Sequence, residues 1–181
     1  MNESLRTLLK SVEILDIYMD GFVARTDNRA PIFNGETLQL LGRHERDAIR
    51  TQPATDDSPA RIEVRYALGV MLAAPGLDGT KESTKAGVIE CHLVATYTVN
   101  GPLPDLQTIE EFANTSVLFN LWPYWREFVQ ESSMRLQWPL IRIPLFKFTN
   151  SVHPTSSAIG QSLPAEKKAP TRTRKRTNVE S

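Results

Sequence analysis

The stretch from Ser116 to Pro139 constrains this chain most, because it contains all three tryptophans and its apolar residues recur at helical spacing. Between Leu118 and Leu136 the apolar side chains follow steps of three and four, which places them on one side of a helix. Pro123 lies inside this pattern, so it must stand in a first turn or kink the helix. The aromatic residues spread around more of the circumference than one core face requires. We therefore expect this helix to pack on two sides.

Three other segments show the period of two that is typical of strands. Residues 61–72 and 86–99 are joined by a Gly/Pro/Asp-rich segment, which predicts an antiparallel hairpin. Residues 12–23 alternate with Leu15, Ile17, Met19 and Val23 on one face and Asp16, Tyr18, Asp20 and Phe22 on the other. Residues 138–143 contain Pro139 and are followed by Pro144, so we expect a short last strand at a sheet edge or beside a bend.

Residues 25–59 show poor periodicity and are bounded by turn-forming residues. A connection of this length inside a compact domain is usually functional or flexible. It nevertheless contains apolar residues, among them Phe33, Leu38, Leu40 and Leu41. We therefore predict a partial cover over a groove, with one or two helical turns.

The composition is that of one globular domain, which we assign to residues 1–150. No apolar run approaches the ~20 residues of a membrane span, and the N-terminus lacks the pattern of a secretory signal. The single cysteine, Cys91, fits a reducing compartment. These features together predict a cytoplasmic protein.

Residues 151–181 are rich in Pro, Ser, Thr, Lys and Arg and have almost no large apolar residue, so we predict a disordered tail. This segment has six basic and two acidic residues, a net charge of +4, and residues 1–150 therefore carry −4, because the whole chain has 21 residues of each sign. No aromatic residue is interleaved with the basic ones, which favours a solubilising segment. Contact with nucleic acid through this tail is the alternative.

Residues that could perform catalysis are scattered. His44, His92 and His153 show no metal-ligand spacing with a cysteine or carboxylate, and no glycine-rich phosphate loop is present. Cys91 falls on the inward face of its strand, as a core thiol does. The sequence thus predicts no enzyme site, no metal and no cofactor.

Two motifs resemble the SecB family of export chaperones. Residues 121–127 read Leu-Trp-Pro-Tyr-Trp-Arg-Glu, and residues 138–144 read Trp-Pro-Leu-Ile-Arg-Ile-Pro. In that family a Phe-Pro-Tyr-x-Arg-Glu segment opens the main helix, and a strand of the form Pro-x-Leu-x-Leu-x-Pro follows it. The order of strand, long connection, two strands, helix and short strand also agrees, over residues 11–148.

The sequence departs from the family at a few positions. Trp122 stands where the family has Phe, and Trp125 stands where it has a small residue. The apolar pattern ends at Phe148, where SecB proteins usually carry a second helix. In this respect the chain is similar to the divergent SecB-like chaperones that accompany toxin–antitoxin modules.

The resemblance implies an α+β fold with a four-stranded antiparallel sheet and one main C-terminal helix. It also implies a homotetramer in which protomers pair through their sheets and two pairs stack through their helices. The implied function is ATP-independent holding of unfolded polypeptides in an extended apolar groove. The clients would be preproteins for Sec export or an antitoxin. A non-chaperone module that binds nucleic acid through the basic tail is the alternative.

The site residues follow from the pattern and the resemblance. Alignment with the family's contact set for the SecA ATPase selects Asp16, Asp20, Val88 and Glu90, although a solvated sheet face is the alternative for each carboxylate. The residues expected to line a client groove are Phe33, Leu38, Leu40, Leu41 and Trp122. Trp125 and Phe128 are expected to pack in the core or between protomers.

Overall fold

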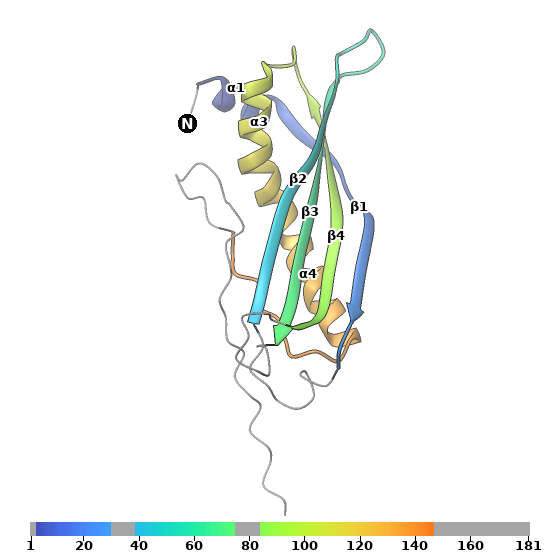
Figure 1. The fold of residues 1–181 in the computed structure, drawn as a ribbon. Coiled ribbons are helices and arrows are strands. Elements are labelled where there is room, and N and C mark those ends of the chain that lie inside the picture. The colour runs from blue at the N-terminus through green and yellow to red at the C-terminus, as the bar shows by residue number, and fades with distance from the viewer. Residues whose placement is uncertain (1–2, 30–38, 75–83, 147–181) are drawn as a thin grey trace, which may run out of the picture.

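The computed structural model describes residues 3–29, 39–74 and 84–146. Four antiparallel strands form one sheet in the order β1-β4-β3-β2. The strands are β1 (Val12–Thr26), β2 (Gln39–Gln52), β3 (Ala60–Ala74) and β4 (Thr84–Val99), and the helices are α1 (Glu3–Ser11), α3 (Leu106–Phe112), the π-helix η1 (Ala113–Val117) and α4 (Leu118–Arg135). Helix α4 runs along one face of the sheet, which we call the inner face, and α1 and α3 lie together at one end (Figure 1).

The core lies between the sheet and α4. The faces predicted for β3 and β4 are confirmed, because the side chains expected to point inward are all buried: Ile62, Val64, Tyr66, Leu68, Val70, Leu72, Ile89, Cys91, Leu93, Ala95, Tyr97 and Val99. From α4, Leu121, Trp125 and Val129 pack onto them. Helix α4 begins directly after η1 and continues through Pro123.

The prediction of four antiparallel strands is confirmed, but one strand is not the expected one. Residues 39–52, which we interpreted as part of a cover, form β2, and residues 138–143 form no strand. Strand β2 lacks a clear alternation because Asp47 is an extra residue between Arg46 and Ala48. Its inner face also carries Gly42 and His44, which weaken the apolar pattern further. The interpretation as a cover was therefore wrong for this part of the chain.

Strand β1 contains two bulges that change which side chains face α4. Its pairing with β4 shifts between Ile14 and Asp16 and again between Met19 and Gly21, where Gly21 has a φ of +155°. After the second bulge, Phe22 faces α4, and its ring centroid lies 5.6 Å from that of Phe128. The prediction that Phe22 shares a face with Tyr18 was therefore wrong, as was the face predicted for Val23. Simple alternation takes no account of bulges.

Tyr66 ties the sheet to the π-helix. Its hydroxyl donates a hydrogen bond of 2.9 Å to the carbonyl oxygen of Ala113, inside the core. The variant Tyr66→Phe leaves that carbonyl without this donor, so we expect the free energy of unfolding to fall by about 1–2 kcal/mol. Urea unfolding at neutral pH measures this change.

The pH dependence of the same variant tests whether the hydroxyl is buried. Burial raises the pKa of Tyr66 to about 12, so the folded protein keeps the proton in a range where an unfolded tyrosine, with a pKa of about 10, loses it. This stabilisation is complete below pH 10 and is lost as the pH rises towards 12. The advantage of the wild type over Tyr66→Phe should therefore shrink between pH 10 and 12. A constant difference would contradict the assignment.

Candidate protein-binding surfaces

The four residues predicted to contact a SecA-type partner lie on the outer face of the sheet, opposite α4. Val88 and Glu90 face outward from β4. Asp16 lies on β1 and pairs with Thr96 of β4. At about 3.3 Å per residue, Thr96 and Glu90 are separated by roughly 20 Å along β4. The four residues therefore share a face but are spread along it.

A network of charged side chains crosses this outer face. Arg65 on β3 lies 2.7 Å from a carboxylate oxygen of Asp20 and 3.2 Å from one of Asp47. The Nδ1 atom of His92 on β4 lies 3.0 Å from the same Asp47 carboxylate. Asp20 and Asp47 are the bulge residues of β1 and β2, so both bulges direct a carboxylate at one arginine. The network links all four strands, and Arg65 offsets one of its two carboxylate charges.

A second arginine lies beside Glu90. The guanidinium of Arg43 on β2 is 3.8 Å from a carboxylate oxygen of Glu90. Because the Arg43 side chain is exposed, solvent screens this pair strongly. Asp16 forms no ion pair with any other described residue. Of the three carboxylates in the predicted contact set, two therefore have a basic partner, and the acidic patch is weaker than the sequence indicates.

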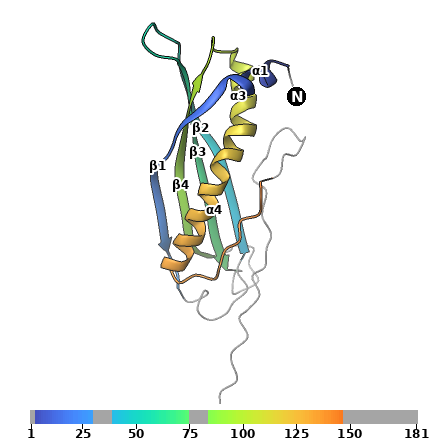
Figure 2. The same cartoon turned by 180° about the vertical axis from the view of Figure 1, so that it is seen from behind.

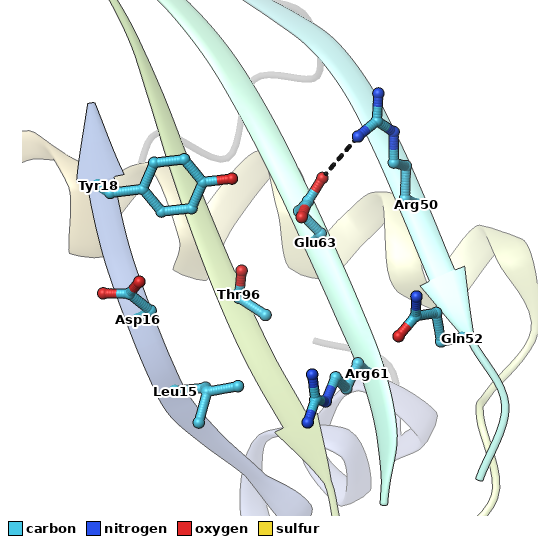
Figure 3. Close-up of a pocket in the computed structure, with 8 residues that line it drawn as sticks. All are labelled: Leu15, Asp16, Tyr18, Arg50, Gln52, Arg61, Glu63 and Thr96. Atoms are coloured by element: carbon cyan, nitrogen blue, oxygen red, sulfur yellow. Dashed lines mark hydrogen bonds and ion pairs between the residues drawn. The ribbon is translucent and has the colours of Figure 1, made fainter. Parts of the chain in front are cut away.

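A shallow pocket of about 540 Å³ lies across the outer face near Asp16 (Figure 3). Side chains from all four strands line it: Leu15, Asp16, Tyr18, Arg50, Gln52, Arg61, Glu63 and Thr96. Arg50 and Glu63 form an ion pair of 3.1 Å between them. The lining carries both signs of charge, together with the apolar surface of Leu15 and Tyr18. It therefore offers a partner both polar and apolar contacts.

Strand β1 is an edge strand with a band of exposed apolar side chains. Its only strand partner is β4, so one side of its backbone has no partner among the described strands. We call its exposed apolar side chains the edge band: Ile14, Leu15, Tyr18, Met19, Phe22 and Val23. Phe22 remains 64% exposed although it contacts α4. A cleft of about 200 Å³ between β1 and α4 continues this apolar surface, with Tyr124 and Phe128 in its lining.

Residues 136–146, which we call the strap, follow α4 and turn back along it on the inner face of the sheet (Figure 2). Trp138 anchors the start of the strap. Its indole nitrogen donates a 2.8 Å hydrogen bond to Oγ1 of Thr26, at the end of β1. Its ring lies over Gly87, so closely that a Cβ atom built there would be 2.2 Å from Cζ2 of Trp138. The side chain of Ile141 is completely buried.

The later part of the strap is held by side chains of α4. Arg126 donates from Nε to the carbonyl oxygen of Ile143 at 3.1 Å, and Trp122 donates from its indole nitrogen to the carbonyl oxygen of Pro144 at 2.7 Å. The Phe146 ring centroid lies 5.3 Å from that of Trp122. Apolar side chains gather here in what we call the strap surface: Phe119, Trp122, Leu145 and Phe146. Phe119 and Leu145 are exposed.

The structure does not bring the predicted groove residues together on one surface. Leu40 is buried in the core, whereas its neighbour Leu41 pairs with Met71 on the outer face. Trp122 is partly buried beside the strap. Phe33 and Leu38 lie outside the described residues, as does the tail at 151–181. The strap surface was missed because nothing in the local pattern shows that residues 140–146 pack on α4.

Other predicted residues occupy the core. Trp125 is 2% exposed, and Phe128 packs against the core cluster from the β1 side. Burial raises the pKa of the Cys91 thiol to about 12, which keeps it protonated at neutral pH. The described residues contain no group of three or more His, Cys, Asp or Glu side chains that could hold a metal ion. None of the described helices is both long and apolar enough to span a membrane.

No family model matches the sequence, and no curated protein matches it. The fold is nevertheless that of a SecB-like chaperone. It is similar to the solved structure of the Mycobacterium tuberculosis Rv1957 SecB-like chaperone in complex with a ChAD peptide from the Rv1956 HigA1 antitoxin, with a TM-score of 0.67 and 19% sequence identity over 82% of this chain and 99% of that chain. A Streptococcus agalactiae protein of unknown function matches 74% of this chain and 97% of its own at 12% identity, with a TM-score of 0.36.

Proposed function

We propose that this chain is a chaperone that holds non-native polypeptides without using a nucleotide. The observation that carries the proposal is the SecB-like fold, which it shares with nearly the whole length of a chaperone whose structure contains a bound peptide. Because that peptide comes from an antitoxin, an antitoxin is the first client to test for this chain. Preproteins destined for Sec export are the second.

The edge band supports assembly with a second copy of the chain. An exposed, apolar edge strand pairs readily with another strand, and proteins seldom leave one uncovered. β1 of one protomer would add to β1 of the next, which joins the two sheets. The SecB resemblance extends this to a tetramer in which two such pairs stack through α4.

The strap surface supports client binding. Its α4 side presents Phe119 to solvent on the same helix as Trp122 and Arg126, two side chains whose N–H groups donate to main-chain carbonyls of the strap. Apolar area combined with main-chain recognition is what a protein needs to bind many different unfolded segments. Burying client apolar surface contributes about 25 cal/mol per Å², less the cost of ordering the client.

Docking of a SecA-type ATPase is a further prediction for the outer face. Asp16, Asp20, Val88 and Glu90 lie on that face, and Asp16 borders the pocket there. The arginines beside Asp20 and Glu90 would have to release those carboxylates for a basic partner. This part of the proposal rests on the family resemblance.

The variant Phe119→Ser tests the client surface. Phe119 is 49% exposed, and its ring centroid lies 6.4 Å from that of Phe146 in the strap. We expect the lost client contact to outweigh the lost strap contact, so binding of a permanently unfolded polypeptide, reduced and carboxymethylated α-lactalbumin, should weaken by about fivefold. Fluorescence anisotropy measures the affinity. The matched control is Met134→Ser, near the end of the same helix and 66% exposed, which should change the affinity less than twofold.

The wild-type protein provides the test of the function itself. It should suppress aggregation of a denatured protein in the absence of nucleotide. Its mass by light scattering should be at least twice the 20.4 kDa of one chain. A chain that remains monomeric and retains no unfolded polypeptide would refute the proposal.

A further inference from the structure

The later part of the strap, residues 140–146, lies on the protein much as a bound peptide would. It has no strand or helix structure, and no backbone–backbone hydrogen bond joins it to another described segment. Between Leu140 and Ile143 its side chains alternate: Ile141 and Ile143 are buried, whereas Leu140 and Arg142 are exposed. The alternation ends at Pro144, because Leu145 is also exposed. The segment thus inserts two alternate aliphatic side chains into the surface beside α4.

The groups that hold this segment do not depend on its particular sequence. The hydrogen bonds from Arg126 and Trp122 reach main-chain carbonyls, which every polypeptide has. The buried sites beneath Ile141 and Ile143 take branched aliphatic side chains, and apolar side chains of similar volume exchange at small cost. Any extended chain with aliphatic residues at alternate positions would meet the same groups.

We propose that residues 140–146 occupy a peptide groove beside α4 as an internal competitor, which an extended segment of a non-native polypeptide with alternating aliphatic residues displaces. The inference rests on the proposed chaperone function and adds to it a control of client affinity. The anchor at Trp138, with its bond to Thr26 and its contact with Gly87, stays in place during the exchange. The segment would leave the groove by pivoting after Pro139.

A tethered competitor lowers affinity in a defined way. The apparent dissociation constant of a client equals its intrinsic value divided by the fraction of protein with an empty groove. Because the strap is part of the chain, it competes at an effective concentration on the order of millimolar. Weakening the strap without altering the groove should therefore tighten client binding. A strap that served only as a structural cover would have the opposite effect or none.

The test uses strap variants of the full-length chain. Ile143→Ala removes buried strap packing and leaves Trp122 and Arg126 intact, so it should bind unfolded α-lactalbumin at least tenfold more tightly than the wild type. It should also bind, in trans, a fluorescent peptide with the strap's own sequence, Trp-Pro-Leu-Ile-Arg-Ile-Pro-Leu-Phe. The matched control Arg142→Ala changes an exposed neighbour in the strap and should alter both affinities less than twofold. Ile143→Val, expected to tighten binding about two- to tenfold, provides the measurement if Ile143→Ala does not fold.

The outcomes separate this inference from the proposed function. If the wild type holds α-lactalbumin but the Ile143 variants bind it equally or more weakly, the strap is no competitor and the inference is overturned, although the chaperone function stands. If no protein holds α-lactalbumin but the variants capture the strap peptide more tightly, the exchangeable strap stands and the proposed function fails. Tighter binding of both probes supports both.

Discussion

Replacing Trp125 with alanine is expected to lower the free energy of unfolding by about 3–5 kcal/mol. The side chain is 2% exposed within a single protomer and belongs to the cluster between α4 and the sheet. Removal of the indole leaves a cavity that neighbouring side chains fill only in part, and the lost apolar burial adds to the cost. Urea unfolding, followed by circular dichroism at a fixed protein concentration, measures the change.

Two comparisons separate core packing from a role between protomers. Tyr124→Ala removes the neighbouring aromatic side chain, which is 49% exposed, and should change stability by less than about 0.5 kcal/mol in a protomer. The effect of Trp125→Ala should also be the same at low and high protein concentrations, because the ring is enclosed by its own chain. A loss that appears only at concentrations where the protein assembles would place Trp125 at a protomer interface instead.

The variant Gly87→Ala is expected to cost about 1–3 kcal/mol of stability, a large effect for one added methyl group. A Cβ atom at this position would lie 2.2 Å from Cζ2 of Trp138 and 2.7 Å from the carbonyl oxygen of Arg25. The indole is held by its hydrogen bond to Thr26, and the Arg25 carbonyl belongs to β1, which pairs with β4 at this level. Neither neighbour is the free end of a flexible side chain, so the strap and the strand must both shift.

Gly69→Ala is the matched control for this prediction. Gly69 lies on β3, and a Cβ atom there would meet its nearest neighbour, Cγ of Glu90, at 3.6 Å, an ordinary contact. The free energy of unfolding of Gly69→Ala should stay within about 0.5 kcal/mol of that of the wild type. Equal losses for the two variants in thermal or urea unfolding would mean that β propensity, and not the Trp138 contact, accounts for the effect.

Much of this fold could be predicted from local patterns. Every residue that the alternation in β3 and β4 placed on the inner face is buried, because both strands are central in the sheet and α4 covers one of their faces. The helical spacing around Trp125 located the main helix for the same reason: one side of the element is buried along its length. The motifs around Trp122 and Pro139 then indicated a SecB-like fold, which the structural similarity bears out.

Edge elements were harder to predict. In β1 and β2 the bulges at Leu15, Asp20 and Asp47 break the alternation, and a change of one residue moves every following side chain to the other face. These strands also bury fewer residues, so their composition carries less of the apolar signal. For this reason Phe22 was assigned to the wrong face, and β2 was not identified as a strand.

The sequence by itself determined the α4 helix, the two central strands and the apolar character of the chain around its tryptophans, because periodic burial leaves a periodic pattern. Only the tertiary structure decided that Asp20 and Asp47 meet at Arg65 and that residues 140–146 lie along α4 beside Trp122 and Arg126. Those contacts join residues distant in sequence through single hydrogen bonds and ion pairs. Such contacts impose no period on the sequence, so they become visible only when the chain is folded.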